Sequence, residues 1–134
     1  MSEAFFDTNV LLYLLSADDP KRGVSAALLA TGGVISVQVL NEFAAVARGK
    51  HALDWDELEA LLDDFRTHFQ VESLTPPVQA RAVHFARRYR IRIYDANILA
   101  VAENAGCSIV YSEDMQDGLN IAAKLTIRNP FLDA

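Results

Sequence analysis

The chain has 134 residues, 51% of them hydrophobic, which is enough for one core and too short for two ordinary domains, so we expect a single domain over residues 1–134. One cysteine cannot close an intrachain disulfide, and the apolar run at residues 10–15 is too short to cross a membrane, which together predict a cytoplasmic protein. The formal net charge of −6 argues against a uniformly basic surface for nucleic acid.

Turn and capping residues divide the first half of the chain into short strands and helices. Asp19 is a helix cap with Pro20 in the first turn, and the Gly32-Gly33 pair is a stop signal. The elements expected here are a strand at 3–6, helices at 8–15 and from 20 to Gly32, a strand at 34–36 and a helix at 37–47.

The second half continues the same alternation. Asp54 and Glu57 have the spacing of a capping box, Pro76-Pro77 is typical of a helix start, and Gly106 of a helix end. The elements expected here are a helix after residue 54, a strand at 71–74, helices from 76 and at 95–105, and strands at 108–111 and 125–127.

Strands that alternate with helices predict an α/β fold, with a mostly parallel sheet of four to five strands covered on both faces. Such sheets place their sites at the carboxyl ends of the strands. Asp7 and Asp114 directly follow two expected strands, and Asp95 begins a helix. Glu42 lies one to two turns inside another helix. We therefore expect these four acids to converge.

Carboxylates gathered near apolar structure lose hydration and repel one another unless a positive charge lies between them. With no cysteine or histidine nearby, the donors are all oxygen atoms, which favours one or two Mg²⁺ or Mn²⁺ ions over Zn²⁺. Such ions activate water and stabilise a leaving oxygen during attack on phosphates. The residues alone thus lead to the hypothesis of a metal-dependent phosphodiesterase.

Four motifs make the chain resemble the PIN domain and, within it, the VapC-type toxins of toxin–antitoxin pairs. They are Phe5-Phe6-Asp7-Thr8-Asn9, Asn41-Glu42, Tyr94-Asp95-Ala96 and Ser112-Glu113-Asp114-Met115-Gln116-Asp117-Gly118. Each motif is short, but their order and spacing extend over nearly the whole chain. The resemblance implies a three-layer αβα fold and a catalytic, metal-binding quartet of Asp7, Glu42, Asp95 and Asp114.

The resemblance also implies supporting residues and partners. Thr8 and Ser112 match recurrent hydroxyl positions, while Asp117 is either a further metal ligand or a turn residue before Gly118. Glu113 is expected to be solvated. The implied activity is cleavage of single-stranded RNA that leaves a 5′ phosphate. The implied assembly is a homodimer silenced by a small antitoxin protein.

Other classes of protein remain as alternatives. A PIN-like module that binds RNA or protein without cutting is the first of these. A receiver-like signalling domain is a weaker alternative. It requires adjacent acids near the first strand and a lysine after a late strand, and neither stands at the right place in this sequence. A haloacid-dehalogenase-like phosphatase requires an acid where Asn9 stands, two residues after Asp7.

Basic residues gather in one stretch despite the acidic balance. Five arginines lie between residues 81 and 92, at positions 81, 87, 88, 90 and 92. They are either a local surface for phosphates or the solvated face of a helix. Both interpretations stay open from the sequence.

Overall fold

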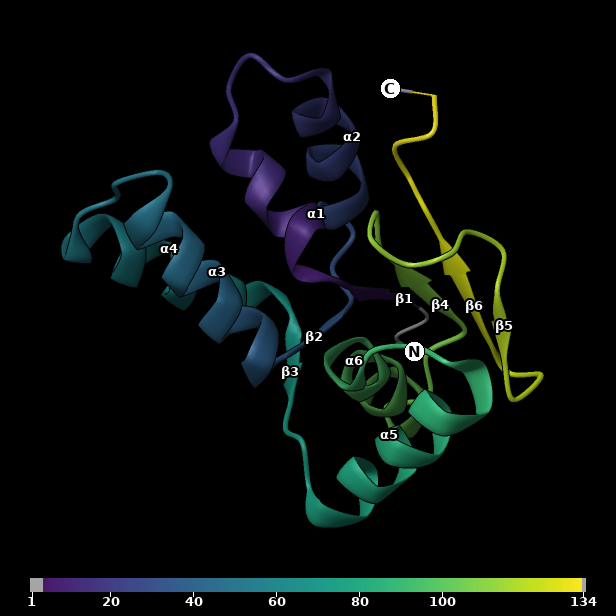
Figure 1. Cartoon of the computed structure of the whole chain (residues 1–134). Coiled ribbons are helices and arrows are strands. Elements are labelled where there is room, and N and C mark those ends of the chain that lie inside the picture. Colours follow the sequence, from purple (N-terminus) through teal and green to yellow (C-terminus); the bar gives the residue numbers. More distant parts are fainter. Residues whose placement is uncertain (1–3, 134) are drawn as a thin grey trace.

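The protein is described here by a computed structural model that covers residues 4–133. Within this range the strands form one six-stranded sheet in the order β3-β2-β1-β4-β6-β5 (Figure 1). The strands are β1 (Ala4–Phe6), β2 (Val34–Ser36), β3 (Gln70–Glu72), β4 (Ile109–Tyr111), β5 (Asn120–Ile121) and β6 (Leu125–Arg128). All neighbouring strands are parallel except β5, which is antiparallel to β6.

Helices cover the sheet and complete a three-layer α/β fold. They are α1 (Thr8–Leu12), the 3₁₀ turn η1 (Tyr13–Leu15), α2 (Pro20–Leu29), α3 (Val37–Gly49), α4 (Trp55–His68), α5 (Pro76–Tyr89) and α6 (Ile93–Asn104). Helices α5 and α6 pack side by side, and α6 also contacts β2 and β6 (Figure 1). None of the helices between residues 4 and 133 is long and apolar enough to cross a membrane.

The capping signals in the sequence are confirmed. The side chain of Asp19 accepts a hydrogen bond from the Lys21 amide at 2.9 Å, with Pro20 in the first turn of α2. Asp54 and Glu57 form both hydrogen bonds of a capping box at the start of α4. These caps satisfy amides that have no partner inside the helix, which is why they mark the boundaries well.

Several expected elements differ from the structure, among them the strand expected at 71–74, which is β3 at Gln70–Glu72. The helix expected at 8–15 is α-helical only as far as Leu12 and then tightens into η1. Helix α6 begins at Ile93 rather than Asp95, with the extended Arg92 as its cap. The expected sheet of four to five strands is too small, because β5 adds a strand of two residues, too short to show any periodicity. Of the first expected strand, residue 3 lies outside the described range.

The core lies along β1 and its two parallel neighbours. Phe5 pairs in register with Val34 on one side and Val110 on the other, and all three side chains are fully buried. Helix α6 is buried from Ala96 to Ala102, so it is an internal helix with apolar contacts all round. This packing holds β1 in the middle of the sheet, so the residue that follows β1 is surrounded by structure.

Candidate active site

Asp7 directly follows β1 and begins α1. Its Oδ1 accepts a hydrogen bond from the Thr8 amide at 2.7 Å, and its Oδ2 accepts one from the Ser112 hydroxyl at 2.7 Å. The residue is only 4% exposed. Burial raises the pKa of Asp7 to about 6, the two hydrogen bonds oppose this rise, and the charges of Asp114 and Glu42 add to it. Asp7 is therefore an acid in an environment short of positive charge.

The strand pairing brings the segment after β4 to Asp7. Strands β1 and β4 are parallel and adjacent, and the Asp7 amide donates to the Tyr111 carbonyl at 3.0 Å. The hydroxyl of the fully buried Ser112 donates to Asp7 and accepts from the Asp114 amide at 3.2 Å. Ser112 thus connects two of the sequence-predicted acids that stand more than 100 residues apart.

Asn9 has a role that the sequence analysis missed. Its side-chain nitrogen donates to Asp114 Oδ2 at 3.0 Å and lies 3.4 Å from Asp7 Oδ2, while its Oδ1 accepts from the Glu113 amide at 3.3 Å. Its amide group thus compensates both carboxylates. The available signal was its place in the first motif, two residues after Asp7, which puts both residues at the same end of α1.

Glu42 reaches the same network from α3. Its Oε2 accepts a hydrogen bond from the Thr8 hydroxyl at 3.0 Å. Thr8 is almost fully buried, whereas Glu42 is exposed. Thr8 therefore binds Asp7 through its amide and Glu42 through its hydroxyl, so three of the four predicted acids share one hydrogen-bonded network.

Asp95 stands apart from that network. It lies in the first turn of α6, where its Oδ2 accepts from Arg92 Nη2 at 3.2 Å and Nε at 3.3 Å. The Arg92 side chain is 76% exposed, so this ion pair is weak and easily exchanged. Among residues 4–133, no hydrogen bond joins Asp95 to the other three acids.

Two further acids have structural partners. Asp117 Oδ1 accepts from the Asn129 amide at 2.8 Å, which ties the turn after β4 to the end of β6. The expectation that Glu113 is solvated is wrong. Its carboxylate accepts hydrogen bonds from the Lys21 ammonium and from the Tyr13 hydroxyl, each at 2.6 Å. Burial raises the pKa of Glu113, but these two donors outweigh it and leave the pKa below its ordinary value. Glu113 thus fixes the segment before Asp114 against α2 and η1.

The chemistry of the donors fits a hard divalent cation. Asp7, Asp114 and Glu42 offer only oxygen atoms, and the side-chain amide of Asn9 lies between the Asp7 and Asp114 carboxylates. Within the described residues, however, no three acidic, histidine or cysteine side chains lie close enough to form a metal site as they stand. An ion between Asp7 and Asp114 would require the Asn9 amide to turn away.

A mostly parallel sheet with acids clustered at the carboxyl ends of β1 and β4 defines the class of protein. The family model described as the PIN domain matches residues 4–120, so the chain belongs to the PIN-domain family. No curated protein matches the chain by sequence.

Several solved structures share this fold. A toxin–antitoxin complex from Klebsiella pneumoniae superimposes with a TM-score of 0.74 at 21% identity, covering 96% of this chain and 98% of that one. The VapC20 toxin of Mycobacterium tuberculosis, described as cleaving the sarcin–ricin loop, superimposes with a TM-score of 0.69 at 23% identity. The match covers 84% of this chain and 90% of that one. DNA-bound VapBC from Salmonella typhimurium gives 0.69 at 18% identity over 97% and 99%. At these identities the likeness establishes the fold.

Proposed function

We propose that this PIN domain is a metal-dependent endoribonuclease that cuts single-stranded RNA and acts as the toxin of a toxin–antitoxin pair. The observation that carries the proposal is the buried, hydrogen-bonded Asp7, linked to Asp114 through Asn9 and Ser112 and to Glu42 through Thr8. The solved structures with this fold include a toxin described as cleaving the sarcin–ricin loop. That description supports RNA as the substrate.

The four acids Asp7, Glu42, Asp95 and Asp114 would hold one or two Mg²⁺ or Mn²⁺ ions. Such an ion supplies hydroxide near neutral pH and stabilises the oxygen that leaves phosphorus. Ser112 and Thr8 orient the Asp7 carboxylate for this task. Glu42 and Asp114 are exposed, so the backbone of an unpaired strand can approach them directly.

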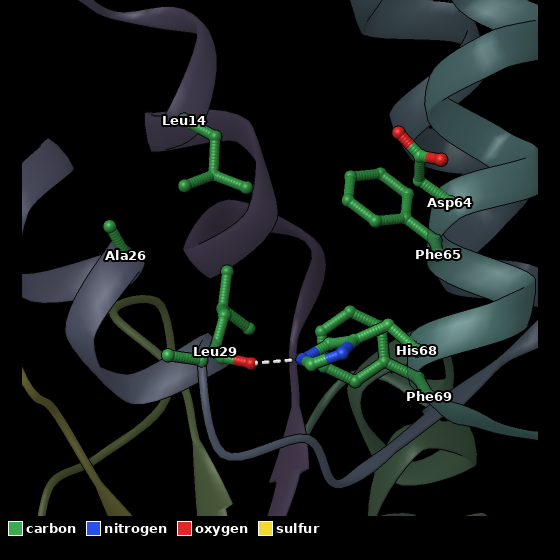
Figure 2. Close-up of a pocket in the computed structure, with 8 residues that line it drawn as sticks. Leu14, Ala26, Leu29, Asp64, Phe65, His68 and Phe69 are labelled. Atoms are coloured by element: carbon green, nitrogen blue, oxygen red, sulfur yellow. Dashed lines mark hydrogen bonds between the residues drawn. The ribbon is translucent and has the colours of Figure 1, made fainter.

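The antitoxin is proposed to bind an apolar groove between α2 and α4. Figure 2 shows residues of η1 and α2 facing residues of α4 across this groove, whose volume is about 290 Å³. The lining consists of Leu14, Ala26, Leu29, Ala30, Asp64, Phe65, His68 and Phe69. A ring nitrogen of His68 lies 2.6 Å from the Leu29 carbonyl oxygen and joins the two walls. An apolar face of a partner helix fits such a groove.

This assignment of a partner is supported by relatives that were solved as toxin–antitoxin complexes. Homodimer formation remains a prediction from the resemblance to VapC-type toxins.

The test of the nuclease is cleavage of labelled single-stranded RNA with Mg²⁺, with Mn²⁺ and with EDTA. We expect metal-dependent cutting by the parent chain and a loss of at least about 100-fold in Asp7→Asn and Asp95→Asn, because each substitution removes a charged ligand. Glu59→Gln, which removes an equal charge from the exposed face of α4, is the matched control and keeps full activity.

Equal cleavage by the parent and both variants would contradict the proposal, since the activity would then come from elsewhere. Metal-independent cutting would contradict the role of the ions. RNA binding without cutting under any metal would favour the alternative of a non-catalytic PIN-like module.

A further inference from the structure

A basic hollow lies at the carboxyl-terminal end of α5, outside the acidic network. It has a volume of about 430 Å³ and is lined by His84, Arg87, Arg88 and Arg90. No acidic residue is among these lining residues. Figure 1 shows that α5 leads through a short connection into α6, the helix whose first turn carries Asp95.

The charges of this hollow are left uncompensated by the protein. Of the arginines between 81 and 92, Arg81 forms a two-point ion pair with Glu103, and Arg92 pairs with Asp95. Within the described part of the chain, Arg87, Arg88 and Arg90 have no carboxylate partner. Like charges that crowd one hollow repel one another, so an anion between them would be stabilised.

The helix end alone explains only part of this cluster. Arg87 and Arg88 lie in the last turn of α5, where cations complement the helix dipole. Arg90 lies beyond that turn in the left-handed conformation, at φ 55°, which glycine adopts with less strain. Its side chain nevertheless lines the hollow, so the position combines strain with charge, as functional sites often do.

A short stretch of chain joins the hollow to Asp95. Arg90 precedes Asp95 by five residues, and five fully extended residues span at most about 18 Å. A single RNA strand with one phosphate at Asp95 can therefore place a phosphate a few nucleotides away at the hollow. Guanidinium groups suit this contact because they bind phosphate oxygens in pairs.

We propose that the hollow formed by His84, Arg87, Arg88 and Arg90 binds a backbone phosphate of the single-stranded RNA, a few nucleotides from the phosphate that is cut. The inference rests on the proposed nuclease function and adds to it where the strand lies on the protein. It also explains how a chain with a net charge of −6 can bind a polyanion, because the arginines of the hollow attract phosphate locally.

The test measures binding of a labelled single-stranded RNA of about 12 nucleotides over a range of salt concentrations, in an Asp7→Asn background that does not cut. Arg87→Gln/Arg88→Gln is expected to weaken binding on the order of tenfold near 0.1 M salt. Because the lost phosphate contact lowers the salt slope by about 0.7, we expect the slope to fall by that amount. Arg87→Lys/Arg88→Lys, which keeps the charge, retains the slope.

The matched control is Arg66→Gln/Lys124→Gln, which removes the same two charges from α4 and from the turn before β6. We expect its affinity to stay within about twofold of the parent and its salt slope to be unchanged. Circular dichroism and Tm values equal to those of the parent exclude misfolding, because all four side chains are exposed.

Three results would overturn the inference. Unchanged RNA affinity in Arg87→Gln/Arg88→Gln would overturn it. If the same variant also lost antitoxin binding, the hollow would be a protein-binding surface instead. Equal weakening in the control would mean that overall charge is responsible. A parent chain that neither binds nor cuts RNA would refute the nuclease function itself, and this inference with it.

Discussion

At the scale of single residues, Asp7 is costly to the fold. Its pKa rises from 3.8 to about 6, chiefly because burial disfavours the charged form. Between these two pH values the folded protein binds more protons than the unfolded chain. The free energy of unfolding therefore falls as the pH rises from about 4 to about 6 and stays low above that range.

Asp7→Asn is expected to stabilise the metal-free protein. The difference between a pKa of 3.8 and one of about 6 corresponds to roughly 3 kcal/mol, which is the upper limit of the gain at pH 7.5. The gain should shrink towards zero as the pH falls to 4, because Asp7 is then neutral in both states. Urea unfolding in EDTA at several pH values measures it. A variant less stable than the parent at pH 7.5 would contradict the desolvation argument.

Ser112→Ala is expected to destabilise the protein by about 1–3 kcal/mol at pH 8, because Asp7 loses a donor and the Asp114 amide loses its acceptor. The loss should be smaller in an Asp7→Asn background, which a double-mutant cycle by urea unfolding would detect. Ser25→Ala is the control: the Ser25 hydroxyl is buried without a hydrogen-bond partner among the described residues, so its removal is neutral or stabilising. Equal losses in both variants would contradict the role of Ser112.

At the scale of elements, local chemistry explains most boundaries. Helices α2, α3 and α4 begin after Asp19, Ser36 and Asp54, and each of these side chains accepts a hydrogen bond from a first-turn amide. These bonds join residues two or three apart, so a short stretch of sequence suffices to predict them. Strand β2 depends in addition on Gly33, which allows the chain to pass close to β1.

Gly33→Ala is expected to cost at least about 2 kcal/mol of unfolding free energy. A Cβ at Gly33 would lie 2.6 Å from Phe6 Cε2 and 2.8 Å from the Ala4 carbonyl oxygen, at a φ of +146°. Gly23→Ala is the control, because nothing lies within 4 Å of a Cβ at that position of α2. Inside a helix, alanine is more stable than glycine by about 0.5–1 kcal/mol. Thermal unfolding should show Tm shifts of opposite sign. Shifts of the same sign would contradict this account of β2.

At the scale of the whole molecule, the proposed surfaces are separate. The acids lie at the carboxyl ends of β1 and β4, the apolar groove between α2 and α4, and the basic hollow at the end of α5. Different residues line each of them. Substitutions in the apolar groove should therefore leave RNA binding and cleavage intact.

Ala26→Arg is expected to weaken binding of the antitoxin at least about 100-fold and to leave RNA cleavage unchanged. Ala26 is exposed and lines the apolar groove, so an arginine there places a charge and a long side chain where a partner helix would pack (Figure 2). Ala80→Arg, at an exposed position of α5, is the matched control. Calorimetry with the proposed antitoxin measures the affinity. Equal affinities in both variants would remove the groove as the binding surface.

The sequence by itself determined the class of fold, most helix starts and the positions of the candidate acids. Caps, prolines and apolar periodicity act over a few residues, and a residue that follows a buried parallel strand lies at the site edge whatever else the chain does. The strand β5, only two residues long, showed no such signal.

Only the tertiary structure decided how the candidate site is connected. Asn9 meets Asp114 across 105 positions and Lys21 meets Glu113 across 92, and both contacts depend on β1 and β4 becoming neighbours in the sheet. Asp95, by contrast, forms an ion pair with Arg92, which is only three residues away in the sequence. Contacts between residues far apart in the sequence depend on strand order and packing. These result from interactions summed over the whole chain, so no short segment of sequence predicts them.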